Sequence, residues 1–318
     1  MKLKVAVLLP TFNGARFVEE QIRSLTENST PFTLHWLDDH STDNTRETVR
    51  TAALATGIDL KEWHQHQHQG WPATFFQLIE CVEADIYMFC DQDDIWQPGK
   101  IDATVTSLLL DVARPVLCFS FASLFKDSDP GTLHRLFADS RSCVEGWMRE
   151  SIVFTTFIAQ GNTIGFTRSL RDLFFGHKEI ARMYASDHDW WMYLIAVAAG
   201  EVRLLDKAPT TLHRRHGNNL SEAYIVQKGR DWIARRWSLE QEMRRMRARN
   251  AQGFLLASAS LPPSQKLERL IALARLMATI GRRQSSAAVI RLARCRAIWP
   301  TFGGALWRAA LYLGSDAR

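Results

Sequence analysis

The segment "MFCDQDDIWQPGKI", residues 88–101, joins an apolar run directly to three aspartates, Asp91, Asp93 and Asp94. The apolar run is typical of a buried strand, because a strand covered on both faces reads as a continuous hydrophobic stretch. Carboxylates crowded at the end of such a strand raise one another's pKa values unless a cation neutralises them. The segment therefore predicts a buried strand whose carboxyl end lies next to a positive charge.

A divalent metal ion is the simplest cation for this position. Asp91 and Asp93 have the D-x-D spacing that offers hard oxygen ligands. Mg²⁺ and Mn²⁺ prefer such ligands and usually complete their shell with substrate phosphates and water. Two other interpretations stay open from the residues alone: the cluster is a solvated acidic turn, or Asp94 only caps a following helix.

The chain around this segment alternates between strand and helix signals. Short strands separated by helices of about 10 to 15 residues predict a parallel sheet covered on both faces, with ligands at the carboxyl ends of the strands. We expect strands at 4–12, 32–39, 85–90 and 118–125, helices at 15–27, 42–57, 71–84 and 186–200, and a strand-to-helix turn at 161–170.

Polar residues follow the first two expected strands as well. Thr11 and Asn13 come after the first, and Asp38 and Asp39 end the second, so both pairs should lie at the edge where Asp91 lies. Carboxylates there can accept hydrogen bonds from a nucleobase or a ribose, which is the role we predict for Asp39, whereas Asp43 suits a helix cap. A plain turn at 38–39 is the alternative.

The length and composition of the chain limit the classes of protein to which it can belong. With 318 residues, 46% of them hydrophobic, the chain can bury a large core, and no stretch reaches the roughly 18 uninterrupted apolar residues of a membrane span. The start reads as a strand rather than a signal peptide. The five cysteines are widely spaced without a C-x-x-C pair, which favours buried thiols in a reducing compartment, by default the cytoplasm.

The charge is distributed unevenly. Residues 228–318 hold 18 Lys and Arg against 5 Asp and Glu, whereas residues 1–227 hold 21 against 29. The basic part reads as helical, with Arg among Leu, Ile and Trp, as in helices that lie on an anionic membrane surface. A helical subdomain packed on the remainder explains the pattern equally well, and a membrane-binding module without catalysis is a rival function. Nucleic acid is disfavoured as a partner.

Two classes of α/β enzyme are weighed by their motifs. A nicotinamide-dependent oxidoreductase lacks support, because "PTFNGARF", residues 10–17, holds a single glycine where a G-x-G-x-x-G is needed, and the P-loop signature is also missing. A sugar nucleotidyltransferase also uses aspartates to bind a metal ion, so this class of enzyme stays an alternative.

Three motifs in order, "VLLPTFNGARFVEEQIRSL" (7–25), "DDHSTDNT" (38–45) and "DQDDIWQPGKI" (91–101), resemble the family 2 glycosyltransferases of the GT-A fold. Within that family they look most like rhamnosyltransferase-type enzymes of bacterial surface polysaccharide synthesis, over about residues 5 to 220. The resemblance implies an α/β GT-A catalytic domain at 1–225 and a basic α-helical extension at 226–318.

The resemblance also implies a reaction. It is an inverting transfer, assisted by Mg²⁺ or Mn²⁺, from a nucleoside diphosphate sugar, with dTDP-rhamnose favoured, to a glycan acceptor that a lipid can carry. The protein would then be cytoplasmic, with peripheral contact to the inner face of the membrane as one expectation. The residues expected around the nucleotide sugar are Thr11, Asn13, Asp38, Asp39, Gly70, Asp91, Gln92, Trp190 and Arg215, and those expected at the metal are Asp91, Asp93 and His216.

The segment "SDHDWWMYL", residues 186–194, resembles the family's His-Asp-Trp-Trp segment, whose aspartate is the general base. The resemblance assigns that role to Asp189, with Asp187 as the competing candidate. An acceptor hydroxyl is a poor nucleophile, so a carboxylate must take its proton as the oxygen attacks. From the residues alone, both aspartates suit a helix cap equally well, and Trp190 and Trp191 suit either a wall for the sugar or the core.

The segment "LHRRHGNNLS", residues 212–221, resembles the family's Tyr-Arg-Gln-His-Gly-Asn-Asn ending. His216 falls on the family histidine, which can approach the metal or diphosphate, and Arg214 and Arg215 can neutralise phosphate charge. His213 replaces the usual tyrosine, which leaves open which histidine faces the site. The stretch 63–75 departs from the family. In a strand, His64, His66 and His68 would share one face and mimic a metal site, but we favour an exposed strand end that leads into a loop near the nucleotide.

Overall fold

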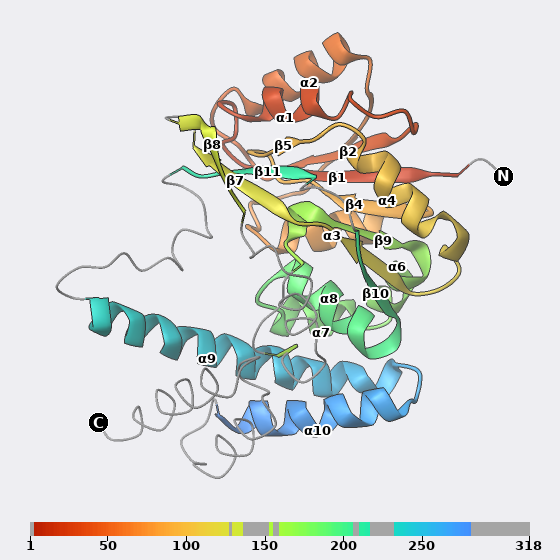
Figure 1. The fold of residues 1–318 in the computed structure, drawn as a ribbon, viewed down its shortest axis with the longest axis vertical. Helices are drawn as coiled ribbons and strands as arrows, with labels where there is room; N and C mark the ends of the chain where they lie inside the picture. Colours follow the sequence, from red (N-terminus) through yellow and green to blue (C-terminus); the bar gives the residue numbers. More distant parts are fainter. Residues whose placement is uncertain are drawn as a thin grey trace.

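The structure is a computed structural model, which describes residues 3–126, 129–135, 153–154, 159–205, 210–216 and 232–280. Within these ranges the central layer is a seven-stranded sheet with helices on both faces (Figure 1). The strand order is β10-β6-β9-β4-β1-β2-β3. The strands are β1 (Val5–Thr11), β2 (Thr33–Asp38), β3 (Asp59–Trp63), β4 (Ile86–Phe89), β6 (Val116–Phe119), β9 (Ile164–Thr167) and β10 (Glu201–Leu204).

Most of this sheet is parallel. β1 pairs in parallel with β2 and β4, β2 with β3, and β6 with β10, whereas β9 is antiparallel to β4 and β6. The prediction of a mostly parallel sheet flanked by helices is confirmed. Since β1, β2 and β4 run in one direction, the polar residues that follow them lie at one edge of the sheet.

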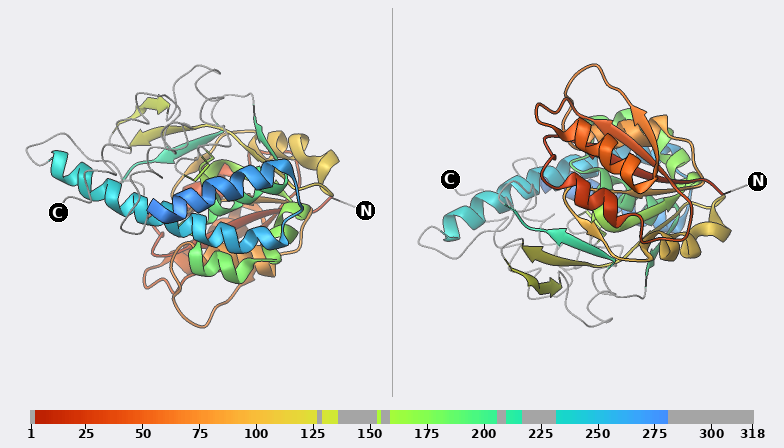
Figure 2. Two further views of the ribbon diagram at one scale, coloured as in Figure 1. Left: turned by 90° about the horizontal axis from the view of Figure 1, so that it is seen from below. Right: turned by 90° about the horizontal axis from the view of Figure 1, so that it is seen from above.

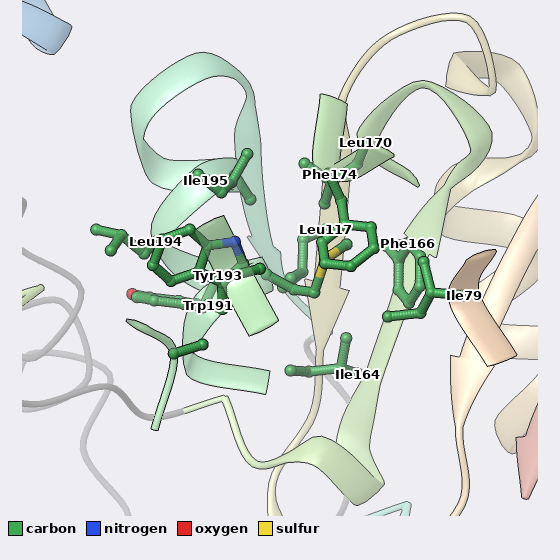
Figure 3. Packing of buried hydrophobic residues seen from close by; sticks show 14 of the residues in the cluster. Ile79, Leu117, Ile164, Phe166, Leu170, Phe174, Trp191, Tyr193, Leu194 and Ile195 are labelled. Carbon is green, nitrogen blue, oxygen red and sulfur yellow. The ribbon is translucent and has the colours of Figure 1, made fainter. Parts of the chain in front are cut away.

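Alternation along the strands explains the two apolar layers. In β1, Val5, Val7 and Leu9 face one cluster, and Ala6 and Leu8 face the other. The first layer lies under α1 (Val18–Ser24), α2 (Thr45–Thr56) and α4 (Lys100–Leu108). The second lies under α3 (Ala73–Cys81), α6 (Arg168–Phe175), α7 (Lys178–Tyr184) and α8 (His188–Ala199), and Figure 3 shows side chains of α8 within this layer.

A second, four-stranded sheet has the order β5-β11-β7-β8. Its strands are β5 (Ile95–Trp96), β7 (Ala122–Lys126), β8 (Asp129–Arg135) and β11 (Thr211–Arg214). The expectation of one strand at 118–125 is wrong in part: Phe119 ends β6, Ala122 begins β7, and the chain changes sheets between them. β5 follows the acidic segment directly and pairs antiparallel with β11, which fixes that segment against a distant part of the chain.

The helices α9 (Trp232–Ala257) and α10 (Gln265–Ile280) lie side by side beyond α7 and α8 (Figures 1 and 2). Buried residues of both helices, including Phe254 and Leu270, belong to the same apolar cluster as α8. This part of the basic region therefore packs on the domain built around the seven-stranded sheet. The expected domain boundary near 225 lies outside the described residues. Among the helices that the structure describes, none is both long and apolar enough to cross a bilayer.

The cysteine expectation holds only in part. Cys90 and Cys118 are buried free thiols, but Cys81 is exposed at the end of α3, because its side chain points away from the face that packs on the sheet. Cys143 and Cys295 lie outside the described residues.

Candidate active site

Asp38 is the last residue of β2 and lies beside Thr11, the last residue of β1. Its carboxylate accepts hydrogen bonds from the Ser41 N–H at 2.9 Å and hydroxyl at 2.6 Å, the Thr11 hydroxyl at 2.9 Å and Arg46 Nε at 2.6 Å. Burial tends to raise the pKa of Asp38, but these hydrogen bonds outweigh it and hold the pKa below its usual value. Asp38 therefore braces the loop, and its contact with a nucleotide stays a prediction.

Asn13 holds the same loop from the other side. Its backbone lies in the left-handed region with φ of 47°, its side-chain oxygen accepts the Thr42 N–H at 2.8 Å, and its own N–H donates to the Ser41 hydroxyl at 2.9 Å. Asp43 accepts the N–H of Thr45, the first residue of α2, at 3.0 Å, which agrees with a role at the helix start.

Asp39 anchors the histidine-containing loop. Its buried carboxylate accepts the backbone N–H groups of Gln69 at 2.8 Å and Gly70 at 2.7 Å, as well as the side-chain amide of Gln65. His68 Nδ1 lies 2.9 Å from Asp39 Oδ2. Gly70 has a φ of 73°, a conformation that favours glycine. The loop thus folds onto the carboxylate that we expected at the nucleotide.

Aromatic side chains lie exposed near this loop, which the sequence interpretation missed. Phe12, 44% exposed, contacts His68 with ring centroids 4.6 Å apart and the ring planes tilted by 39°, and Trp71 is 41% exposed. Phe12 directly follows β1, and Trp71 precedes α3, which begins at Ala73 and not at residue 71 as expected, so neither residue belongs to a periodic pattern. Such faces suit stacking with a nucleobase or a sugar ring.

Gln92 ties the acidic segment to the loop after β1. Its side-chain oxygen accepts the Phe12 N–H at 2.9 Å, and its side-chain amide donates to the Phe12 carbonyl at 3.1 Å. A Cβ added to Gly14 would lie 2.3 Å from that Gln92 oxygen, so a larger residue at position 14 would displace the Gln92 amide. Gln92 therefore holds two strand ends in register, and any contact with the nucleotide sugar would be additional.

Asp94 points inward and joins three separate parts of the chain. Its carboxylate accepts the Arg214 N–H at 3.0 Å, lies 2.9 Å from His213 Nδ1 and accepts the Asn162 side-chain amide. The helix-cap interpretation of Asp94 is wrong, because α4 begins only at Lys100. This contact shows where His213 points: its imidazole faces the buried Asp94 carboxylate.

Asp93 and His216 form the next pair. His216 Nε2 lies 2.8 Å from Asp93 Oδ2, and the imidazole stacks on Phe17 with ring centroids 4.6 Å apart. The structure therefore brings His216 to the acidic segment, as the motif implies, and metal binding by the two residues stays a prediction. Gly217 and the residues after it up to 231 lie outside the described residues.

Asp91 is the carboxylate that most needs a cation. Burial and the neighbouring carboxylates of Asp94 and Asp93 raise its pKa well above the usual value. Within the described residues its carboxylate accepts no hydrogen bond and has no ion pair. A divalent ion would stabilise the charged form of this group, and its hard oxygens are the donors that Mg²⁺ or Mn²⁺ takes. The site therefore fits such an ion.

Within the part of the chain that the structure describes, no three His, Cys, Asp or Glu side chains form a complete metal cage. Protein sites often hold Mg²⁺ through one or two carboxylates while substrate phosphates and water supply the rest.

Asp189 lies in the first turn of α8. Its Oδ2 accepts the Gly161 N–H at 2.8 Å and its Oδ1 the Trp190 N–H at 2.7 Å. Burial, with help from the charge of Asp187, raises the pKa of Asp189 to about 8. Asp189 in turn contributes to the raised pKa of Asp91, so the two carboxylates lie within electrostatic range of each other. The carboxylate of Asp187 accepts a hydrogen bond from the Ser186 hydroxyl at 2.7 Å.

The aromatic residues of the same segment are buried. Trp190 is 3% exposed and donates its indole N–H to the Val153 carbonyl at 2.7 Å, and Trp191 lies in the core (Figure 3). His188 stacks on Phe75 with ring centroids 3.7 Å apart. The Trp190 ring thus occupies the core in this structure, and its contact with a sugar stays a prediction.

The two arginines of the later motif take different positions. Arg214 is 4% exposed: its Nε donates to the Asp93 carbonyl at 2.9 Å and its guanidinium pairs with Glu20. It braces the acidic segment instead of facing solvent as a phosphate ligand. Arg215 is partly exposed, and its backbone N–H donates to the Phe125 carbonyl at 2.9 Å. A phosphate contact by Arg215 stays a prediction.

A cavity of about 380 Å³ lies where the start of α3, the end of α7 and the middle of α9 meet. Its lining includes Pro72, Ser186 and Met246, and none of the predicted site residues. It is therefore separate from the acidic edge, although Ser186 directly precedes Asp187.

Comparison with known proteins assigns the class. Residues 6–171 match the family described as Glycosyl transferase family 2, and the chain belongs to that family. It has the GT-A fold of a glycosyltransferase.

Individual proteins resemble this chain in sequence or in structure. The chain is 25% identical over 229 residues to the dTDP-rhamnosyl transferase RfbG of Shigella flexneri, covering 70% of this chain and 76% of that protein. The structure resembles residues 1–349 of TarS from S. aureus in complex with UDP-GlcNAc, with a TM-score of 0.53 at 15% identity, covering 99% of this chain and 91% of that one. It also resembles the mannosyltransferase PcManGT of Pyrobaculum calidifontis in complex with GDP-Man and Mn²⁺, with a TM-score of 0.51 at 17% identity, covering 99% and 88%.

Proposed function

We propose that the protein transfers a sugar, rhamnose being favoured, from a nucleoside diphosphate donor to a glycan acceptor, with inversion at the anomeric carbon. The observation that carries the proposal is a pair of carboxylates, Asp91 after β4 and Asp189 in the first turn of α8. Asp91 lacks a partner within the described residues, and Asp189 lies within its electrostatic range with a raised pKa. The similarity to a dTDP-rhamnosyl transferase supports the choice of donor.

Asp91 and Asp93 would hold a divalent ion, with His216 beside Asp93. Bound there, the ion would neutralise charge that develops on the departing diphosphate. A relative of the same fold is described with Mn²⁺ and GDP-Man, which is consistent with this proposal. Asp94, Arg214 and Gln92 would keep the segment in place through the contacts described above.

Asp189 would act as the base. Its carboxylate takes the proton of the acceptor hydroxyl while that oxygen forms a bond to the anomeric carbon and the bond from that carbon to the diphosphate oxygen breaks. The nucleoside diphosphate leaves with the bonding electron pair. Because attack and departure occur on opposite faces of the carbon, a single displacement inverts its configuration.

The test is incubation with Mn²⁺ and a panel of dTDP-, UDP- and GDP-sugars, with the released nucleotide identified by chromatography. Release of a nucleoside diphosphate is expected, with dTDP-rhamnose the best donor. Formation of a sugar nucleotide with release of inorganic diphosphate would instead support the nucleotidyltransferase alternative. The anomeric proton coupling of the product, measured by NMR, would distinguish inversion from retention.

A second proposal concerns the basic helices: they bring the enzyme to an anionic membrane where a lipid-carried acceptor lies. In α10 the buried side, including Leu270 and Met277, faces the protein, while Arg269 and Arg275 are exposed. Because α9 and α10 share the core of the catalytic domain, truncation would disturb the fold, and charge reversal is the cleaner test. Arg269→Glu with Arg275→Glu should reduce sedimentation with phosphatidylglycerol vesicles; equal sedimentation, or none by either protein, would remove the proposal.

A further inference from the structure

One short turn, Gly161–Thr163, lies between the acidic segment and Asp189. The side-chain amide of Asn162 donates to Asp94 Oδ2. The backbone N–H of the preceding residue, Gly161, donates to Asp189 Oδ2 at 2.8 Å. Two consecutive residues therefore hold the two halves of the proposed active site.

Buried polar groups hold the Gly161–Thr163 turn in place through hydrogen bonds to its backbone. Asn162 is 2% exposed, and its backbone carbonyl accepts hydrogen bonds from Lys100 Nζ and from the Thr211 hydroxyl at 3.0 Å. Lys100 is 1% exposed, donates to the Thr211 hydroxyl at 2.8 Å and lies over the Trp96 ring at 3.6 Å. These contacts leave the turn little freedom, because buried polar groups that lose their partners cost free energy.

The turn also passes directly against the base. A Cβ added to Gly161 would lie 3.0 Å from His188 Nε2 and 3.3 Å from Asp189 Oδ2. The position of the Asp189 carboxylate therefore follows the position of the turn.

We propose that Asn162 is a positioning residue that couples the acidic segment to Asp189 through the Gly161–Thr163 turn: its side chain holds Asp94, and the turn that it fixes presents the Gly161 N–H to Asp189. This inference rests on the proposed function. Its physical basis is that a residue which orients a metal-binding group or a base affects affinity and rate without touching the substrate.

The experiment compares Asn162→Ala with a control in the same turn, Thr163→Val. Thr163 is equally buried, and its hydroxyl donates to the Gln160 carbonyl at 2.7 Å, within the turn. Mn²⁺ affinity in the presence of dTDP is measured by electron paramagnetic resonance, and kcat and donor KM are measured by nucleotide release. Asn162→Ala should weaken Mn²⁺ binding about tenfold and lower kcat about tenfold or more, whereas Thr163→Val should change both less than about twofold.

A donor–acceptor exchange protects the test against a variant that fails to fold. Asn162→Asp places a second carboxylate against Asp94, and adding Asp94→Asn restores the hydrogen bond with donor and acceptor reversed. The double variant should regain Mn²⁺ affinity and kcat to within about threefold of the wild type, as expected for a coupled pair.

Three outcomes would overturn the proposal. They are an Asn162→Ala protein with wild-type Mn²⁺ affinity and kcat, a change in only one of the two quantities, or a double variant no better than Asn162→Asp. The metal titration needs no sugar turnover, so it separates this inference from the proposed function. A wild-type protein that binds Mn²⁺ and dTDP but transfers no sugar would contradict the function alone.

Discussion

Asp94 and His213, separated by 119 residues in the chain, meet at 2.9 Å between Oδ1 and Nδ1. Burial alone would lower the pKa of His213, but Asp94, with Asp91 and Asp93, raises it to about 9, so the imidazole carries a positive charge at neutral pH. The third aspartate of the acidic segment is thus neutralised from within the protein. Asp91 and Asp93 are left at the edge of the sheet.

Asp189→Asn should abolish turnover while donor binding persists. The amide keeps the size of the side chain but cannot accept a proton, so kcat should fall by at least about 100-fold. Donor affinity, measured by isothermal titration calorimetry with Mn²⁺ present, should stay within about twofold, because Asp189 is not placed against the nucleotide. An active Asp189→Asn enzyme would refute the base assignment.

The pH dependence of kcat/KM should report the raised pKa of Asp189. A base must be deprotonated to act, so activity should rise with pH through a midpoint near 8 rather than near the ordinary carboxyl value of about 4. Asp187→Asn removes the neighbouring negative charge that contributes to the shift and should move the midpoint to lower pH with activity retained. A midpoint below about 5 in the wild type would contradict this prediction.

Asp93→Ala should weaken binding of metal and donor together. The variant removes one of two carboxylates proposed to hold the ion, and the diphosphate is expected to bind through that ion. Thermal shift of the variant and the wild type, with and without Mn²⁺ and dTDP, measures both effects. Glu179→Ala, an exposed acidic residue on α7, serves as the charge control. Equal donor binding with and without metal in both proteins would show that the metal role is wrong.

Asp38→Ala should lower the free energy of unfolding by about 3 kcal/mol at pH 7, because it strands donors of Thr11, Ser41 and Arg46. The folded-state pKa of Asp38 is lowered, so its contribution is fully present above the unfolded pKa of about 3.9 and is lost as the pH falls through the folded value.

Urea denaturation at several pH values measures this effect. The difference from the wild type should shrink below pH of about 4. Glu47→Ala on α2, an exposed acidic residue, should cost less than about 1 kcal/mol. A destabilisation by Asp38→Ala that is no larger than that control would contradict the bracing role.

Gly14→Ala should raise the donor KM about fivefold by displacing Gln92 from Phe12, and Gln92→Ala should have a similar effect. Because both changes break the same contact, the double variant should be no worse than the more affected single variant. Additive effects, measured from the KM values of all three proteins, would show that the two residues act independently.

The sequence by itself determined the family and the edge of the sheet where the polar residues gather, but not the strand order or the antiparallel β9. Apolar runs ending in Thr11, Asp38 and Asp91 place polar groups on one edge, because parallel strands share a direction, and this needs no knowledge of the packing. The order of the three motifs then identified the family. The prediction of a single strand at 118–125 was wrong, because the chain passes from one sheet to the other within this stretch. An apolar run shows that a segment is buried but not which sheet it belongs to.

Only the tertiary structure decided what each polar side chain does. The sequence separated Asp91 and Asp93, with their D-x-D spacing, from Asp94, which it offered as a helix cap. The fold instead pairs Asp94 with His213 and Asn162, pairs Asp93 with His216, and leaves Asp91 without a partner among the described residues. Those partners come from segments far away in the chain, and burial and distance to them, rather than residue type or spacing, set the charge and freedom of each carboxylate.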